Sequence, residues 1–317
     1  MNIVDFLANS MLAGTPLLFG ILGEICNERV GHLNLGVEGM MSLGACCGFM
    51  IGLAFDNIVL ALIAAFVAGA LGALIYGVVT ITFMADQTVT GLTLTIFGVG
   101  VSNFVGELML SNAPEKVLKL GETINAQIAN INIPGLSDIP VAGPLLFSYN
   151  MFVYLGVVIA LILAFYFSRT TAGLHARVIG ENPAAADAAG INVKKLKYLH
   201  VMLGGGICGI GGAYASMITN GGVWLPNSVN GQGWVAVALV IFASWKPSKA
   251  ILSAFVFGAC SVLKFYIPKS LLPMPNAIYD MLPFIVTALV LIISSVRRYK
   301  ENQQPASCGQ NYFREER

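Results

Sequence analysis

Polar residues separate two long apolar runs near the amino terminus. The segment Asn27–Gly39 lies between these runs and contains glycines at positions 31, 36 and 39. Glycine weakens a helix, so we expect the helical chain to break here. A broken backbone beside a membrane needs protein or a water-filled cavity around it, and transporters build pathways at such breaks. The candidate pathway residues are Asn34, Gly36, Glu38 and Gly39, and a plain turn between two helices is the alternative.

A second candidate is one face of the apolar segment Thr88–Leu110. Small and polar residues recur there at helical spacing, at Thr88, Gly91, Thr95, Gly98 and Ser102. This stripe fits the lining of a pathway or close helix packing, and Thr88, Thr95 and Ser102 are its candidate pathway residues. Other small-residue series indicate packing alone, namely Ala65, Gly69, Ala73 and Gly77; Gly44, Gly48 and Gly52; and Gly205 with Gly209.

A weak internal echo adds two further residues. The segment Asn230–Trp234 repeats the polar and glycine pattern of Asn34–Gly39, and an apolar run follows each. In the topology given below, the two segments enter the membrane from opposite sides, as an inverted repeat requires. Asn230 and Gln232 are therefore candidate pathway residues, with a chance match as the alternative.

The polar loop over residues 168–198 encodes one short helix. Asn182 is a preferred amino-terminal cap, Pro183 suits the first helical position, alanines follow, and Gly190 is the expected terminator. A helix of about seven residues is too short to be stable alone. We therefore expect it to rest on the membrane surface or on a partner protein, and a plain connector is the alternative.

The motifs of several enzyme classes are missing from the sequence. It has no G-x-x-x-x-G-K-[ST] phosphate-binding loop, so it cannot itself hold ATP in that way. It also lacks H-E-x-x-H, G-x-S-x-G and the Cys/His spacing of a zinc site. The three histidines, at positions 32, 175 and 200, are far apart in the sequence. We expect neither a catalytic centre nor a metal or cofactor bound by this chain.

The composition places the chain in a membrane. Hydrophobic residues make up 56% of its 317 residues, charged residues only 10%, and the mean hydropathy is +0.78. A soluble chain carries about 25% charged residues, so a water-soluble domain is excluded, and so is a disordered chain. The 17 basic and 16 acidic residues leave no cationic surface for nucleic acid. A polytopic membrane protein remains.

About nine stretches are apolar enough to cross a bilayer, which needs about 20 apolar residues in a helix. The seventh has only about 11 cleanly apolar residues, which suits a half-helix or a re-entrant segment as well as a crossing. We expect a single all-α transmembrane domain over residues 1–317, a bundle of about nine spans within a range of eight to ten. The expected spans are Phe6–Ile25, Val37–Phe55, Ile58–Phe83, Thr88–Leu110, Met151–Phe167, Leu199–Ile218, Gly231–Trp245, Ala250–Phe265 and Ala277–Val296.

Basic residues set the expected orientation, because cytoplasmic loops are enriched in Lys and Arg. With the loop over 168–198 in the cytoplasm, the alternation of nine spans places 13 of the 17 basic residues inside. The amino terminus and the loop over 111–150 then lie outside. The carboxyl terminus, with a tail over 299–317, lies in the cytoplasm.

Four motifs, spread in order over nearly the whole chain, give a resemblance to a known family. They occupy residues 28–41, 133–147, 177–193 and 309–314. The chain resembles the permease subunits of bacterial ABC importers of the ribose and branched-chain amino acid type, most closely the nucleoside or simple-sugar branch. It departs from the family pattern at Val30 and His32, where smaller or aliphatic residues are common.

The resemblance implies a membrane transport subunit with several partners. Such permeases pair in the bacterial cytoplasmic (inner) membrane, often as two different subunits, so we expect a heterodimer. A cytoplasmic ATPase hydrolyses ATP for the pair, and an extracytoplasmic lipoprotein delivers the solute; no nucleic acid is involved. The resemblance makes residues 180–192 the coupling helix on the ATPase, with contacts at Gly180, Glu181, Asn182, Pro183, Asp187 and Gly190.

Alternating access is the mechanism that the resemblance implies. We expect the solute to be a nucleoside or a related molecule; riboflavin and a simple sugar stay open, because the sequence identifies no pocket. An ion-coupled secondary carrier is a different class and needs ionisable residues in mid-span. It is disfavoured because the acidic residues lie toward the ends of the expected spans, at Glu24, Glu38, Asp86 and Glu107.

Overall fold

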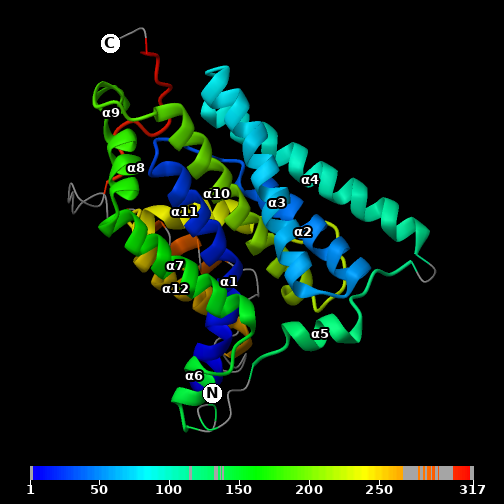
Figure 1. Cartoon of the computed structure of the whole chain (residues 1–317). Helices are drawn as coiled ribbons and strands as arrows, with labels where there is room; N and C mark the ends of the chain where they lie inside the picture. The colour runs from blue at the N-terminus through cyan, green and yellow to red at the C-terminus, as the bar shows by residue number, and fades with distance from the viewer. Residues whose placement is uncertain are drawn as a thin grey trace.

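In the computed structural model the chain is a bundle of helices (Figure 1). The structure describes residues 3–113, 116–131, 135, 137, 139–266, 278, 281–282, 284–286, 288–289, 292 and 303–314. Within these residues, the one β-bridge pairs Lys119 with Val223 in antiparallel fashion. The helices are α1 (Ile3–Glu28), α2 (Val37–Phe55), α3 (Ile58–Gly77), α4 (Gln87–Asn112), α5 (Glu122–Ile128), α6 (Ala142–Leu146), α7 (Met151–Arg169), α8 (Thr171–Glu181), α9 (Pro183–Ala188), α10 (Val193–Tyr214), α11 (Gln232–Phe242) and α12 (Pro247–Tyr266), with π-helical turns η1 (Val78–Thr82) and η2 (Ala215–Thr219).

Seven helices in the described part are long and apolar enough to cross a membrane. They are α1, α2, α3 with η1, α4, α7, α10 with η2, and α12. The predicted all-α membrane bundle is therefore confirmed, but nine full crossings is too high for the described residues. The predicted span Gly231–Trp245 contains only the 11 residues of α11, which at 1.5 Å each reach about half of a 30 Å core. The predicted span Ala277–Val296 lies mostly outside the described residues.

Helix α10 lies at the centre of the bundle and packs against α1, α2 and α3. The predicted packing seams meet on this helix. A methyl group on Gly209 would overlap the carbonyl oxygen of Ala65 on α3, and one on Gly44 of α2 would overlap the backbone of Gly209. Such close backbone approach lets helices associate where lipid removes the hydrophobic drive to do so. The packing role predicted for these residues is confirmed.

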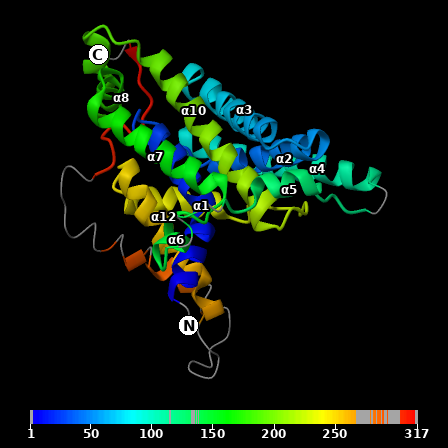
Figure 2. The same ribbon diagram turned by 60° about the horizontal axis from the view of Figure 1, so that its bottom comes forward.

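The two ends of the bundle carry different elements. Helix α8 and the terminal segment, residues 303–314, lie at one end, and the amino terminus lies at the other (Figures 1 and 2). The loop predicted over 168–198 holds more helix than expected. Helix α7 continues to Arg169, α8 follows it, and α10 begins at Val193, ahead of the predicted start at Leu199. Most of this loop is thus a helical extension of the bundle.

The packing at Gly209 makes a testable prediction. Gly209→Ala should lower the free energy of unfolding by about 1–3 kcal/mol, because the added methyl overpacks the contact with α3. The matched control is Gly100→Ala on α4, where a methyl meets nothing within 4 Å. There the gain in helix propensity should stabilise the protein by up to about 1 kcal/mol. Denaturation of the detergent-purified variants measures both, and shifts of the same sign would contradict the packing argument.

Candidate functional site

The chain breaks between α1 and α2 as predicted, and the break is buried inside the bundle. Asn34 has no exposed surface. Its backbone N–H donates to Glu24 Oε1 at 2.9 Å, and the N–H of Leu33 donates to Gln87 Oε1 at 2.8 Å. The side-chain oxygen of Asn34 accepts from the N–H of Gly36 at 2.9 Å. In a continuous helix, backbone carbonyl oxygens would accept hydrogen bonds from these N–H groups. Lipid offers no acceptors, so the side chains of Glu24, Gln87 and Asn34 accept them here.

The carbonyl groups of the break are bound in the same way. The hydroxyl of Tyr76 on α3 donates to the carbonyl oxygen of Leu33 at 2.8 Å. The hydroxyl of Thr95 on α4 donates to the carbonyl oxygen of Leu35 at 2.9 Å. Three helices, α1, α3 and α4, therefore contribute side chains that hold the irregular backbone in one position.

A second break in the helical chain ends at the amino terminus of α11, and Glu38 binds the backbone there. Glu38 Oε1 accepts from the N–H of Gly231 at 2.8 Å, and Oε2 accepts from the N–H of Gly233 at 2.6 Å. A methyl group on Gly233 would overlap the backbone of Glu38. The carboxylate thus faces the positive end of the α11 dipole, where a negative charge is stabilised. The two segments that the sequence echo paired are in direct contact.

The small and polar stripe of α4 packs against the start of α2. Methyl groups on Gly91 or Gly98 would overlap the backbone of Leu35 or Gly39, respectively. Thr95 and Ser102 are buried on this face, whereas Thr88 is exposed. Four of the five residues of the stripe therefore lie in the packed interface between α4 and α2.

The two candidate residues near α11 lie in different surroundings. Asn230 is exposed and has a φ of 51°, in the left-handed region. Gln232 is the first residue of α11, and its side-chain oxygen is buried without a hydrogen-bond partner among the described residues. The structure thus brings one group of predicted pathway residues together where α2 and α11 begin: Asn34, Gly36, Glu38, Gly39, Thr95 and Gln232.

The far end of α11 reaches the end of α1. The indole N–H of Trp245 donates to Glu28 Oε2 at 2.5 Å, and the guanidinium of Arg29 donates to the carbonyl oxygen of Trp245 at 2.9 and 2.6 Å. Ahead of α11, the N–H of Asn227 donates to the side chain of Asn103 on α4 at 2.9 Å. An irregular stretch and a half-length helix together take the place of one long helix.

The predicted short helix is present as α9. The side chain of Asn182 accepts from the N–H of Ala185 at 3.0 Å, and Pro183 occupies the first position. Gly190 follows the helix with a φ of 79°, a conformation that suits glycine. The carboxylate of Asp187 accepts from the hydroxyl of Tyr312 at 2.9 Å and pairs with Arg314 at 3.1 Å. Helix α9 is therefore held by the carboxyl-terminal part of the chain.

The terminal segment belongs to what the sequence analysis described only as a cytoplasmic tail, and the structure packs it across this end of the bundle. The N–H and the hydroxyl of Ser307 both donate to the carbonyl oxygen of Gly180, at 2.9 and 2.6 Å. The N–H of Ala306 donates to Glu181 at 3.4 Å. The amide of Asn311 donates to the carbonyl oxygens of Met84 and Ala85, at 2.6 and 3.1 Å.

Sequence reasoning did not assign these contacts to the terminal segment. The feature of the sequence that could have indicated such contacts is the group of polar residues in the motif at 309–314. Asn311 also accepts from Gln87 at 3.2 Å, and Gln87 binds Leu33 in the first break. One line of hydrogen bonds thus runs from α9 through the terminal segment to the buried backbone, although no two of its elements are neighbours in sequence.

Cys308 lies in the same contact, beside Glu28 and partly buried. Its sulfur is 3.9 Å from Glu28 Oε2. Burial, with the nearby carboxylate charge of Glu28, raises the pKa of the Cys308 thiol. The thiol therefore stays protonated at neutral pH and packs as a small side chain rather than acting as a nucleophile.

Comparison with known proteins identifies the family. The family model described as branched-chain amino acid transport system / permease component matches residues 6–291. A guanosine ABC transporter permease protein of Bacillus subtilis is 36% identical over 92% of this chain and 93% of that protein. A nucleoside ABC transporter permease protein of Lactococcus lactis is 32% identical over 92% and 94%. A putative glucose ABC transporter permease protein of Haloferax volcanii is 33% identical over 80% and 74%.

The family match covers most of the chain, and two of these relatives match it over almost their whole length. The helical membrane bundle described above is the architecture that such a permease needs. This chain therefore belongs to the family of permease components of branched-chain amino acid transport systems.

Proposed function

We propose that this chain is the membrane permease subunit of an ATP-driven importer for nucleosides or related solutes. The observation that carries the proposal is the line of contacts from α9, at one end of the bundle, to the broken helices inside it. Relatives with the names of guanosine and nucleoside permeases match the chain over 92% of its length and support the substrate class. The chain would move the solute across a bacterial cytoplasmic membrane without an ATPase site of its own.

Three partners belong to this proposal. A cytoplasmic ATPase docks on α9, whose exposed and capped form presents residues 181–190 at the end of the bundle. A second, different permease subunit covers α4, whose outer face is apolar and exposed at Leu92, Ile96, Phe97 and Phe104. A substrate-binding lipoprotein docks at the opposite end, near the amino terminus, which then lies outside the cell.

The contacts suggest how movement of α9 reaches the pathway. ATP binding and hydrolysis in the partner shifts α9, and Asp187 passes the shift to Tyr312 and Arg314. The terminal segment then moves Asn311 and, through it, Gln87, which holds the buried backbone at Leu33. Packed elements that change position together in this way convert a displacement at one end into opening at the other.

The residues where α2 and α11 begin line the proposed pathway. Asn34, Glu38 and Thr95 fix the backbone, and the side-chain oxygen of Gln232, which has no partner among the described residues, can accept a hydrogen bond from a polar solute. A sugar is the second candidate solute, favoured by the relative from Haloferax volcanii. An ion-coupled carrier is less well supported, because Glu24 and Glu38 already accept hydrogen bonds from backbone amides.

The coupling role of α9 predicts the effect of Asp187→Lys. The change removes the acceptor for Tyr312 and places a second cation beside Arg314. Uptake should fall by about tenfold or more, because hydrogen bonds to charged groups contribute about 1.5–3 kcal/mol and 1.4 kcal/mol is a factor of ten. ATP hydrolysis by the assembled complex should persist. Transport by reconstituted vesicles measures the first effect and phosphate release the second.

The control for this variant is Glu122→Lys, the same change of charge on the exposed α5. Its uptake should stay within about twofold of the unmodified chain, since surface substitutions act weakly. Normal uptake by Asp187→Lys would contradict the coupling role of α9.

The contact between Glu38 and α11 predicts a loss of stability in Glu38→Gln. The amide group keeps one acceptor but leaves a buried backbone N–H unbound, which costs about 1–3 kcal/mol. Uptake should also decrease, because α11 loses its fixed position. Glu107→Gln, at an exposed site on α4, should change stability by less than about 0.5 kcal/mol. Thermal unfolding in detergent compares the two, and equal midpoints would refute the role given to Glu38.

The proposed solute predicts what the partner lipoprotein carries. Affinity purification of the chain in mild detergent should recover an ABC ATPase and a lipoprotein, and mass spectrometry should find a nucleoside in the latter. Uptake of radiolabelled guanosine should then be inhibited by other nucleosides and not by glucose. If glucose or riboflavin is recovered in place of a nucleoside, the proposed substrate class is wrong, but the proposed permease function still holds. Transport that persists after deletion of the ATPase would refute the ATP-driven mechanism.

A further inference from the structure

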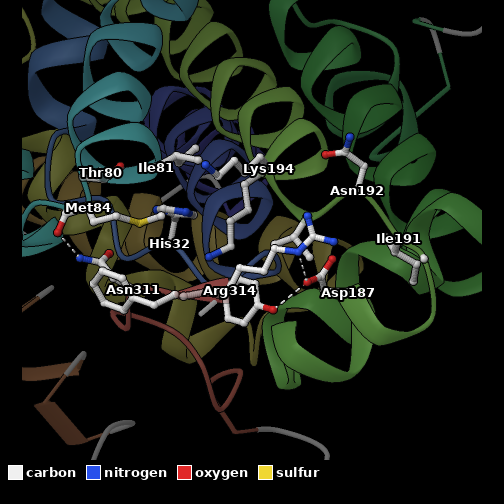
Figure 3. A pocket seen from close by; sticks show the side chains of 15 residues that line it. His32, Thr80, Ile81, Met84, Asp187, Ile191, Asn192, Lys194, Asn311 and Arg314 are labelled. Carbon is white, nitrogen blue, oxygen red and sulfur yellow. Dashed lines mark hydrogen bonds and ion pairs between the residues drawn. The ribbon is translucent and has the colours of Figure 1, made fainter. Parts of the chain in front are cut away.

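A cavity of about 700 Å³ lies between α9, the start of α10, the π-helical turn η1 that follows α3, and the terminal segment. In Figure 3, His32 and Met84 lie on one side of it, and Asp187 and Ile191 lie on the other. Asn311 and Arg314 border it from the terminal segment. This volume is within the range of small-molecule sites, about 300–1,000 Å³.

Cations outnumber anions in the lining of this cavity. Lys194, Lys197 and Arg314 contribute positive charge, and Asp187 is the acidic residue that faces them. Asp187 is already bound by Arg314 and the hydroxyl of Tyr312. Within the described part of the chain, the ammonium groups of the two lysines have neither a hydrogen-bond nor an ion-pair partner. Two positive charges therefore remain without a counter-charge there.

The imidazole of His32 is a polar group in the lining that no described residue satisfies. The residue is 1% exposed, and neither ring nitrogen has a hydrogen-bond partner among the described residues. Burial and the positive charge of Lys197 lower the pKa of His32, so its ring is neutral and presents one N–H and one bare nitrogen. A buried polar group of this kind requires an explanation, and a bound ligand supplies one.

The amino terminus of α10 opens on the same cavity. Asn192 caps the helix by accepting from the N–H of Lys195 at 3.0 Å. The N–H groups of Val193 and Lys194 precede the first helical hydrogen bond and have no acceptor among the described residues. Free amides and the positive end of a 22-residue helix form an anion-binding arrangement.

We propose that this cavity binds a small phosphate-bearing anion. The phosphate lies on the free amides at the start of α10 and is paired with Lys194 and Lys197. His32 donates its ring N–H from the opposite wall, and the terminal segment covers the ligand. Lysine ammonium groups and helix amino termini are both common phosphate ligands, and their convergence distinguishes this cavity from a merely polar surface.

The volume leaves room for more than the phosphate group itself. The anion is therefore a phosphorylated small molecule from the cytoplasm or the headgroup of an anionic lipid. Both present the same phosphate chemistry, and the cavity lies at the end of the bundle where either can reach it. A ligand here would contact α9, α10 and the terminal segment at once.

The test uses the full-length chain in nanodiscs of two compositions. In phosphatidylcholine nanodiscs, binding of adenosine monophosphate and inorganic phosphate is titrated by calorimetry. In nanodiscs containing phosphatidylglycerol, native mass spectrometry counts retained anionic lipids. We expect saturable binding in at least one arm. Lys197→Gln and Lys194→Gln should each weaken it by about tenfold, since a charge-assisted bond of about 1.5 kcal/mol corresponds to that factor.

Lys195→Gln is the matched control, because Lys195 is exposed next to these residues and does not line the cavity. It should bind like the unmodified chain. His32→Gln tests the opposite wall, and its thermal midpoint is measured to confirm that it is folded. A folded His32→Gln variant with weakened binding supports the site.

Three outcomes would overturn the proposal. Equal losses in Lys195→Gln and Lys197→Gln would indicate only nonspecific charge attraction. If neither a soluble phosphate compound at millimolar concentration nor an anionic lipid binds, the cavity is not an anion-binding site. The third concerns Glu315 and Glu316, the acidic residues that follow Arg314. If binding appears only after both are changed to Gln, the end of the chain itself neutralises these cations.

Discussion

The polar groups of a broken backbone must be satisfied inside the protein, and most of the described structure follows from this constraint. Lipid offers no donors or acceptors, so each break in a spanning helix needs dedicated partners. Glu24 and Gln87 accept the N–H groups of the first break, and the hydroxyls of Tyr76 and Thr95 bind its carbonyls. Glu38 does the same for the start of α11. Helices α1, α3 and α4 are thereby fixed around the two breaks.

The same constraint links the interior of the bundle to its end. Gln87 uses its oxygen for the buried backbone at Leu33 and its amide nitrogen for Asn311 of the terminal segment. The terminal segment in turn contacts α8 at Gly180 and α9 at Asp187. A shift of α9 therefore changes the surroundings of a residue that holds the break in place.

Local sequence signals predicted the local structure, and long-range partners could not be predicted. The cap at Asn182 and the terminator Gly190 depend on residues within one turn, so α9 was foreseen. The glycine seams were foreseen because their spacing of four defines one helix face. The sequence placed Glu38 at the end of a span, but it did not predict the partner of its carboxylate, which is the backbone N–H of Gly231, 193 residues later in the chain. The docked terminal segment likewise depends on tertiary contacts that composition and periodicity do not encode. The short length of α11 was indicated by the sequence, because only about 11 residues of that stretch are cleanly apolar.

The charges around the breaks favour a neutral polar solute. Two helix amino termini, those of α2 and α11, begin in one region, and each contributes a positive partial charge. The carboxyl groups of Glu24 and Glu38 accept hydrogen bonds from backbone amides of the two breaks, so they hold the local backbone instead of standing free to bind an ion. On the proposed pathway, hydrogen bonding then remains as the means of recognising a solute, and the side-chain oxygen of Gln232 has no hydrogen-bond partner among the described residues. Nucleosides and sugars are recognised by such bonds, whereas a coupling ion needs a carboxylate that is free to bind it.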